Sequence, residues 1–217
     1  MRIIFVRHAE SDHAHDNLTD QGRSQAAAVA ERLAGEGITR IFAGPARRAG
    51  LTAYFTAKRL DLPLDMLFCL REIAWSVPGS SHDTPPWILG RRMLEEGFDF
   101  SSSDWQEHPY FDGNIVTECY RALADEFDTF LEEYGYRHED RRFFCENGSA
   151  ETIAAFSHGG STEAILAHVL NLPFPYVMHV MQHEPASIII LEFPVNNGAY
   201  VFPRIELFND CSCLLTK

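Results

Sequence analysis

Residues 3–11 read IIFVRHAES, and the interpretation of the whole chain begins at this stretch. The apolar run at residues 3–6 predicts a buried strand, and Arg7 and His8 follow it without a linker. A polar stretch fills residues 10–17. Thr19 is then placed to cap a helix whose apolar residues repeat at helical spacing. The chain is therefore expected to open as strand, charged turn and helix.

Strands and helices continue to alternate further along the chain. The hydrophobic pattern predicts strands at residues 38–43, 66–70 and 152–157, and helices at residues 47–60, 116–134 and 161–170. Two late strands, at residues 187–193 and 200–207, are expected to pair antiparallel across the Asn196-Asn197-Gly198 turn. This alternation predicts an α/β fold, a three-layer sandwich with a mostly parallel central sheet and helices on both faces.

The regular pattern is interrupted at about residues 73–114, where prolines, glycines and serines are frequent. A long irregular stretch inside a compact domain is usually functional or disordered. Trp75, Trp87 and Trp105 and a helical patch at residues 87–94 favour an ordered segment. We therefore expect a single domain over residues 1–217, with a cap inserted at about residues 73–114.

Composition and charge narrow the function classes. The formal net charge of −13 disfavours nucleic acid and anionic membranes as partners, because both attract a basic face. No export signal and no run of apolar residues long enough to cross a bilayer are present, so the expected location is cytoplasmic. The five cysteines form no CxxC pair, and no metal or cofactor motif is visible. The sequence leaves the oligomeric state open.

Candidate site residues follow three of the predicted strands at their carboxyl ends. They are Arg7-His8, Arg71-Glu72 and His158-Gly159. Ligands of open α/β sheets bind beyond the carboxyl ends of the strands, so these residues are expected to meet in space. Phosphoryl transfer through a side chain needs a nucleophile, cations for the phosphate oxygens and an acid for the leaving oxygen. All three requirements are met by a set of five residues: Arg7, His8, Arg48, Glu72 and His158.

The chain resembles the histidine phosphatase superfamily, the phosphoglycerate mutase-like fold, over nearly its whole length except the cap. The segment RHAES at residues 7–11 is similar to the RHG motif of that family. Further matching segments follow in the family's order: LT at 18–19 with Gly22 and QA at 25–26, GPARRA at 44–49 with TA at 52–53, LREI at 70–73, SHGG at 157–160 and ND at 209–210. Ala9 replaces the usual glycine, and Ala43-Gly44 replaces a familiar serine pair.

The resemblance implies a role for each matching residue. His8 would be phosphorylated, and Arg7 and Arg48 would clamp the phosphate. His158 would contact the same phosphate and stabilise the transition state. Glu72 would protonate the leaving oxygen and then activate water. The Gly159 N–H, at the start of a helix, would add an anion-binding contact, and no metal or other cofactor would be needed.

Several of these roles have competitors in the sequence. Arg47 competes with Arg48, and Glu10, Asp83 or Glu184 could replace Glu72 as the acid. The remaining histidines are expected to be surface or structural residues, although His82 and His183 could reach the site. They are His13, His15, His82, His108, His138, His168, His179 and His183.

Three functions follow from the resemblance. The first is a metal-independent phosphatase acting on a small phosphorylated metabolite through a phosphohistidine on His8. The alternatives are a phosphoglycerate mutase and a phospho-ligand binding or regulatory domain without catalysis. The segment between Glu10 and Asn17 is short for a mutase substrate loop, and it carries Asp12 and Asp16, which would repel a substrate carboxylate. The phosphatase is therefore favoured.

Overall fold

The computed structural model of the chain describes residues 1–77, 83–101 and 104–214. The strands are β1 (Arg2–Arg7), β2 (Ser11–Asp12), β3 (Asn17–Leu18), β4 (Arg40–Ala43), β5 (Leu64–Met66), β6 (Tyr136–Glu139), β7 (Arg142–Cys145), β8 (Thr152–Ser157), β9 (Ile188–Glu192), β10 (Ala199–Val201) and β11 (Arg204–Asp210). The α-helices are α1 (Asp20–Leu33), α2 (Arg47–Leu60), α3 (Pro86–Glu95), α4 (Val116–Glu133), α5 (Gly159–Val169) and α6 (Phe174–Val180). Short 3-10 helices are η1 (Phe68–Leu70), η2 (Trp105–Glu107), η3 (Pro109–Phe111) and η4 (Ser212–Leu214).

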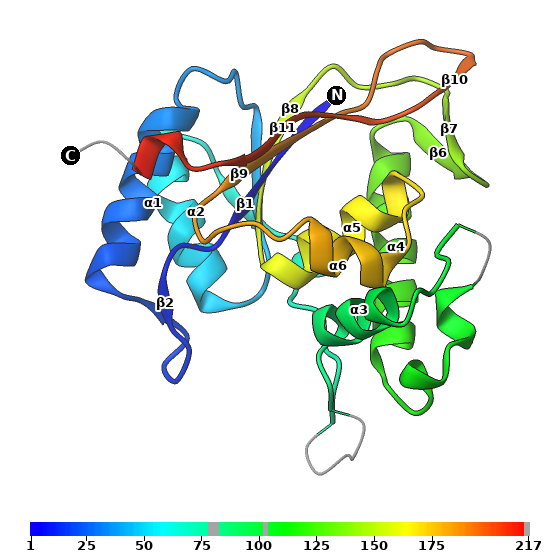
Figure 1. Ribbon diagram of the computed structural model, residues 1–217. Coiled ribbons are helices and arrows are strands. Elements are labelled where there is room, and N and C mark those ends of the chain that lie inside the picture. The colour runs from blue at the N-terminus through cyan, green and yellow to red at the C-terminus, as the bar shows by residue number, and fades with distance from the viewer. Residues whose placement is uncertain (78–82, 102–103, 215–217) are drawn as a thin grey trace.

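The central sheet has the strand order β11-β9-β1-β8-β4-β5. Strands β1, β8, β4 and β5 are parallel, whereas β9 and β11 are antiparallel to their neighbours. Helices α1 and α2 lie on one side of this sheet, and α4, α5 and α6 lie on the other (Figure 1). The expected mostly parallel sheet with helices on both faces is confirmed.

The first strand explains why the sheet is covered on both sides. Ile3 and Phe5 belong to the hydrophobic core on the side of α4 and α5, whereas Ile4 and Val6 belong to the core on the side of α1 and α2. Successive side chains of a strand point to opposite faces, so a run of four apolar residues must be buried on both. The short sequence before Arg7 therefore fixes the strand at the centre of the sandwich.

The predicted helices are present, and α1 begins as expected. The Thr19 hydroxyl accepts a hydrogen bond from the Gly22 N–H at 3.0 Å and so caps the helix. Gly22 is required there because an added Cβ would lie 1.9 Å from the carbonyl oxygen of Glu10. Helix α2 spans the predicted residues, Arg47–Leu60.

Two strand predictions are wrong in detail. The segment predicted as a strand at residues 66–70 divides into β5 and the 3-10 helix η1, because Cys69 and Leu70 turn into the core instead of continuing along the sheet edge. The segment at residues 200–207 also divides at Pro203, which has no N–H for a sheet ladder. Strand β10 pairs with β7 in a separate sheet, whereas β11 pairs antiparallel with β9.

Residues between Ile73 and Asn114 include α3, η2 and η3. Gly90 of α3 lies so close to α6 that an added Cβ would be 2.0 Å from the Pro175 carbonyl oxygen. The rings of Trp75 and Trp87 meet edge to face at 4.9 Å between centroids. The division into a single domain with an inserted cap stays a prediction.

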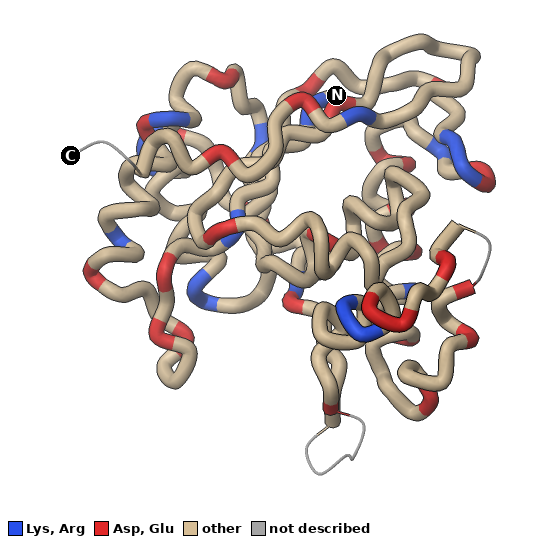
Figure 2. Tube along the Cα trace, viewed as in Figure 1, with Lys and Arg blue, Asp and Glu red and all other residues tan. Residues whose placement is uncertain are grey.

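Charge is spread over the whole molecule. Figure 2 shows acidic and basic residues interspersed along much of the trace. Among the residues that the structure describes, no helix is both long and apolar enough to cross a bilayer.

Candidate active site

The carboxyl ends of β1 and β8 bring the two predicted histidines together. Arg7 is in register with Ser157, and the His8 N–H donates to the Ser157 carbonyl at 2.9 Å. The rings of His8 and His158 therefore lie next to each other, with 5.2 Å between their centroids and an interplanar angle of 60°. Parallel pairing of two distant strands creates this pair.

His8 is held in one tautomer. Its Nδ1 lies 2.9 Å from the carbonyl oxygen of Ala9, and a carbonyl can only accept, so Nδ1 carries the proton. Nε2 is then unprotonated and has a free lone pair. Burial lowers the pKa of His8 to about 4, and the Arg48 and Arg7 guanidinium groups add to this effect against the opposing Ala9 hydrogen bond. The neutral imidazole of His8 is therefore the dominant form near pH 7.

His158 is fully buried and also neutral. Burial, followed by the charge of Arg48, lowers its pKa to about 3. Its Nδ1 lies 3.0 Å from Nη2 of Arg48, and a guanidinium can only donate, so Nδ1 accepts and Nε2 carries the proton. That Nε2 has no hydrogen-bond partner in the described part of the chain. It is a proton donor that a phosphate oxygen could use.

Arg48, and not Arg47, faces the histidines. The Arg47 side chain is exposed, whereas Nη1 of Arg48 lies 2.7 Å from Oδ1 of Asp16. The same carboxylate accepts the Arg47 N–H at 2.7 Å, so Asp16 caps α2, which has no side-chain cap from Ala46. Burial would raise the pKa of Asp16, but its hydrogen bonds with Arg48 and with the helix end outweigh burial and lower it. The carboxylate therefore stays ionised and orients the arginine.

Arg7, the second arginine of the site, is held by the segment that follows α6. Its Nη1 donates to the His183 carbonyl, and its buried Nε has no partner among the described residues. Gly159 lies against the guanidinium, because an added Cβ would be 3.4 Å from the Arg7 Cζ. Gly159 is also the first residue of α5, so its N–H has no acceptor within the helix. The predicted arginine and glycine thus lie side by side.

Glu72 reaches the histidines from the loop that follows η1. Its Oε1 accepts the Ile73 N–H at 3.1 Å, and its Oε2 lies 3.8 Å from Nδ1 of His158. Burial raises the pKa of Glu72 despite the opposing Ile73 hydrogen bond and arginine charges. Gly160 makes room for this carboxyl, since an added Cβ would lie 2.8 Å from Oε1. A carboxyl of raised pKa can hold the proton that a leaving oxygen requires.

The competing acids lie in different surroundings. Glu10 accepts a hydrogen bond from the Thr19 hydroxyl at 2.7 Å and so belongs to the start of α1. Asp83 is exposed. Glu184 is exposed and lines a pocket beside Glu72. His82 lies outside the described residues.

A pocket of about 390 Å³ opens beside Arg7 and Glu72. Two buried residues, Glu163 and His183, also line this pocket, and neither belongs to one of the motifs recognised in the sequence. Nδ1 of His183 lies 3.4 Å from Oε1 of Glu163, and neither ring nitrogen of His183 makes a hydrogen bond among the described residues. Burial raises the pKa of Glu163 to about 9 and lowers that of His183 to about 3, so the pair is uncharged near neutral pH.

The sequence contains one indication that Glu163 is buried. It is an acidic residue inside the otherwise apolar and small run of α5, where a surface carboxylate would be unusual. The sequence also allows His183 to reach the site. The structure places it in the pocket wall, with its carbonyl bonded to Arg7.

The sequence profile of the histidine phosphatase superfamily, branch 1, matches residues 3–205, which is nearly the whole chain. The chain belongs to this superfamily. The resemblance seen in the sequence is confirmed, and this histidine phosphatase is an enzyme of the phosphoric monoester hydrolase type. A comparison with curated protein sequences found no significant match.

Solved structures share the fold of this histidine phosphatase at low sequence identity. A variant of a phosphoserine phosphatase from Entamoeba histolytica, crystallised with phosphoserine, aligns with a TM-score of 0.65 and 19% identity, covering 99% of each chain. A mycobacterial glucosyl-3-phosphoglycerate phosphatase aligns with a TM-score of 0.61 and 22% identity, covering 96% of this chain and 98% of its own. These likenesses establish the shared fold.

Proposed function

We propose that this histidine phosphatase hydrolyses phosphate monoesters of a small metabolite through a phosphohistidine on His8, without a divalent metal. The observation that carries the proposal is the state of His8. Its Nδ1 proton is bound to the Ala9 carbonyl, so Nε2 is free to attack. Arg7, Arg48 and His158 surround this imidazole and supply the charge and hydrogen bonds that phosphate oxygens need.

In the first half-reaction, Nε2 of His8 attacks phosphorus. A P–N bond forms while the bond between phosphorus and the ester oxygen breaks. Glu72 gives its proton to the departing oxygen, so the alcohol leaves neutral. The raised pKa of Glu72 supports this role, because it increases the fraction of the carboxyl that is protonated near pH 7.

In the second half-reaction, water attacks the phosphorus of phosphohistidine. Glu72, now ionised, takes a proton from that water, the P–N bond breaks, and the lone pair returns to Nε2 of His8. Inorganic phosphate leaves, and Glu72 is again protonated. Arg7 and Arg48 stay charged throughout, which supports a reaction in which guanidinium groups take the place of a metal ion.

The pocket beside Glu72 is proposed to hold the leaving group. Its volume of about 390 Å³ suits a small molecule. Trp75 and Trp87 form part of its wall and would shield the reaction from water. Phosphoserine and glucosyl-3-phosphoglycerate, named for the two structural neighbours, belong to the same class of small phosphorylated compounds.

The charge of the pocket supports hydrolysis over phosphoglycerate mutation. Among the described residues that line it, Arg7 is the one arginine or lysine, while Glu72, Glu163 and Glu184 contribute carboxyl groups. A mutase must hold the carboxylate of phosphoglycerate while the phosphate moves between hydroxyls, and such a carboxylate finds no second cation here. The net charge of −13 fits a cytoplasmic metabolite phosphatase that does not bind nucleic acid.

The test compares two reactions of one preparation. Phosphate release from a panel of phosphorylated metabolites is measured beside interconversion of 3- and 2-phosphoglycerate, with and without 2,3-bisphosphoglycerate. We expect release from several monoesters to exceed interconversion by orders of magnitude and to vanish in His8→Ala. Rapid interconversion with little phosphate released would indicate a mutase. Phosphate binding without turnover would indicate a binding domain.

A further inference from the structure

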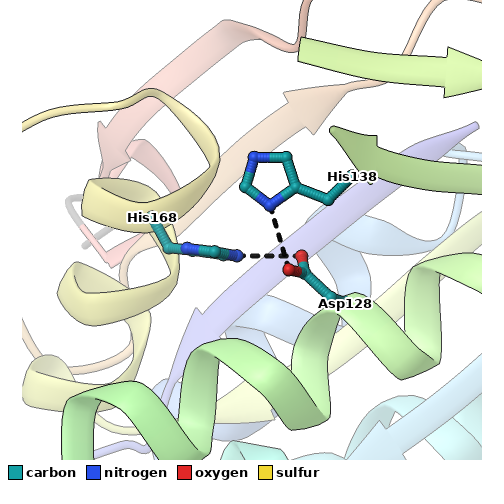
Figure 3. A group of neighbouring side chains, drawn as sticks. All are labelled: Asp128, His138 and His168. Atoms are coloured by element: carbon teal, nitrogen blue, oxygen red, sulfur yellow. Dashed lines mark hydrogen bonds and ion pairs between the residues drawn. The ribbon is translucent and has the colours of Figure 1, made fainter. Parts of the chain in front are cut away.

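A second cluster of ionisable side chains lies away from the catalytic histidines. Asp128 of α4, His138 of β6 and His168 of α5 converge from three separate elements (Figure 3). Nδ1 of His138 lies 2.9 Å from Oδ2 of Asp128, and Nε2 of His168 lies 2.8 Å from Oδ1. One ligand atom from each residue can be chosen so that all three lie within 4.8 Å of one another.

The cluster is sheltered but remains accessible from solvent. The side chains of Asp128, His138 and His168 retain 23%, 13% and 16% exposure. The ring of His138 stacks on Phe143 at 4.4 Å with an interplanar angle of 10°, which fixes its orientation. Figure 3 shows both imidazoles directing a nitrogen at the same carboxylate. Both rings therefore already face the place where a shared metal ion would bind.

We propose that Asp128, His138 and His168 bind a zinc ion through a carboxylate oxygen, Nδ1 and Nε2, with water in the fourth position. Zinc favours imidazole and carboxylate ligands in a tetrahedral arrangement at about 2.0–2.2 Å. Donor atoms of such a tetrahedron are about 3.3–3.4 Å apart. The nitrogen–oxygen pairs at 2.8 and 2.9 Å involve the two different oxygens of Asp128. To admit the ion, each pair would separate by about half an ångström or more, and each ring would release the proton that it shares with the carboxylate.

The carboxylate already carries the charge that zinc requires. Asp128 accepts a hydrogen bond from each of the two imidazoles, at 2.9 and 2.8 Å, and an ionised carboxylate is the form that accepts both. Metal-binding histidines usually donate their other nitrogen to a supporting acceptor. Nε2 of His138 has no such partner among the described residues. We therefore expect reversible zinc binding, weaker than in a site whose ligands are all supported.

The position of the site indicates a structural role. His158 precedes α5 and His168 lies in its last turn, and ten residues of helix rise about 15 Å. A zinc ion at His168 is therefore too far from His8 to contact a bound phosphate. It would instead link α4, α5 and the β6–β7 hairpin. Zinc binding should raise stability and leave turnover unchanged.

The experiment uses the full chain after chelator treatment and removal of the chelator. Zinc chloride is titrated calorimetrically, and the melting temperature is recorded with zinc and with chelator. Magnesium serves as a comparison ion, because it prefers oxygen ligands. We expect one zinc per chain and a rise in melting temperature of about 5–10 °C at a hundredfold excess over Kd. Magnesium should have no effect.

Three variants decide whether the binding belongs to this cluster. Asp128→Asn keeps the shape of the side chain and one carbonyl acceptor but removes the charge, and His168→Ala removes a ligand. Both should lose the zinc-dependent shift while retaining phosphatase turnover, which also reports that they fold. His179→Ala, a partly exposed histidine of α6, should keep the shift of the wild type.

Three results would overturn the proposal. If the wild type binds no zinc stoichiometrically, the cluster is a hydrogen-bonded network that needs no ion. If the zinc-dependent shift persists in both Asp128→Asn and His168→Ala, the ion binds elsewhere on the chain. If Asp128→Asn melts below the wild type by the same amount with zinc and with chelator, Asp128 stabilises the protein through its hydrogen bonds alone and not through an ion.

Discussion

Nη2 of Arg48 lies 3.0 Å from Nδ1 of His158, while Nη1 of the same guanidinium lies 2.7 Å from the Asp16 carboxylate. One arginine is therefore shared by the second histidine and by an acidic residue of the short β2–β3 hairpin. Asp16 both orients Arg48 and neutralises part of its charge. A bound phosphate must compete with this carboxylate for the guanidinium.

We predict that Asp16→Asn binds inorganic phosphate more tightly. Asparagine is a good helix cap and can still accept the Arg47 N–H, so α2 keeps its start while the competing charge is lost. An ion pair worth about 1 kcal/mol corresponds to a change of about 3–10-fold in affinity. The measurement is the inhibition constant of phosphate with p-nitrophenyl phosphate as substrate.

Asp12→Asn is the matched control for this change. Asp12 belongs to the same hairpin, but its carboxylate pairs with the exposed His15 at 2.5 Å and not with Arg48. The control should leave the phosphate inhibition constant unchanged. Weaker phosphate binding in Asp16→Asn would mean that Asp16 acts mainly by holding Arg48 in place.

The nucleophile can be identified by trapping. Brief incubation with substrate and a rapid quench should leave acid-labile, base-stable phosphate on the wild-type protein and none on His8→Ala. His13→Ala is the matched control, because its ring centroid lies 6.0 Å from that of His8. An adduct of unchanged yield in His8→Ala, or its loss in His13→Ala alone, would reassign the nucleophile.

Two carboxyl groups of raised pKa, Glu72 and Glu163, line the pocket, and their variants should behave differently. Glu72→Gln should lower kcat by about 10²–10⁴-fold for alkyl phosphates, because a general acid contributes that much. The loss should be smaller for p-nitrophenyl phosphate, whose leaving group hardly needs a proton. Glu163→Gln should show no such dependence on the leaving group. If the dependence appears in Glu163→Gln instead, Glu163 is the acid.

Much of this site could be predicted because it depends on where strands end. His8 and His158 follow parallel strands in register, so their order in the sequence implies their meeting in space. Arg48 follows β4, which pairs with β8 in the same sheet. The local patterns that predict a strand also predict which residues its carboxyl end presents.

The residues that could not be predicted depend on packing between distant segments. The sequence indicates Asp16 only as a group that would repel a substrate carboxylate, whereas its role as the partner of Arg48 follows from the path of the β2–β3 hairpin beside α2. Glu163 and His183 meet only because α5 and the segment after α6 form one pocket wall. Likewise, no local signal indicates that β10 pairs with β7 across the chain.

Chelation should separate turnover from stability. Arg7 and Arg48 supply the positive charge of the proposed reaction, so exhaustive chelator treatment should leave kcat at 25 °C within experimental error. The same treatment should lower the melting temperature if zinc occupies the cluster of Asp128, His138 and His168. A loss of kcat that one added metal restores would contradict metal-independent hydrolysis, whatever happens to the melting temperature.

The buried carboxyl of Glu163 should make the wild type less stable as pH rises. Its pKa is raised to about 9 by burial, so the folded chain keeps a proton that the unfolded chain releases above about pH 4.5. Stability is therefore lost as pH increases toward 9, with a slope of up to about 1.4 kcal/mol per pH unit from this group. The lowered pKa values of His8, His158 and His183 act below pH 6.5, where stability falls as pH decreases.

Glu163→Gln replaces the protonated acid with a neutral group of the same shape and should remove that slope. Urea unfolding at about pH 6.5, 7.5 and 8.5 gives the free energy of unfolding in the range where Glu163 acts and the three histidines do not. The stability of the variant relative to the wild type should rise from one pH to the next, so the accumulated difference is largest at the highest pH. Glu184→Gln, an exposed residue of the same pocket, is the matched control and should follow the wild type. Parallel curves for Glu163→Gln and the wild type would show that Glu163 is already ionised in the folded protein, and that His183 or Arg7 balances its charge.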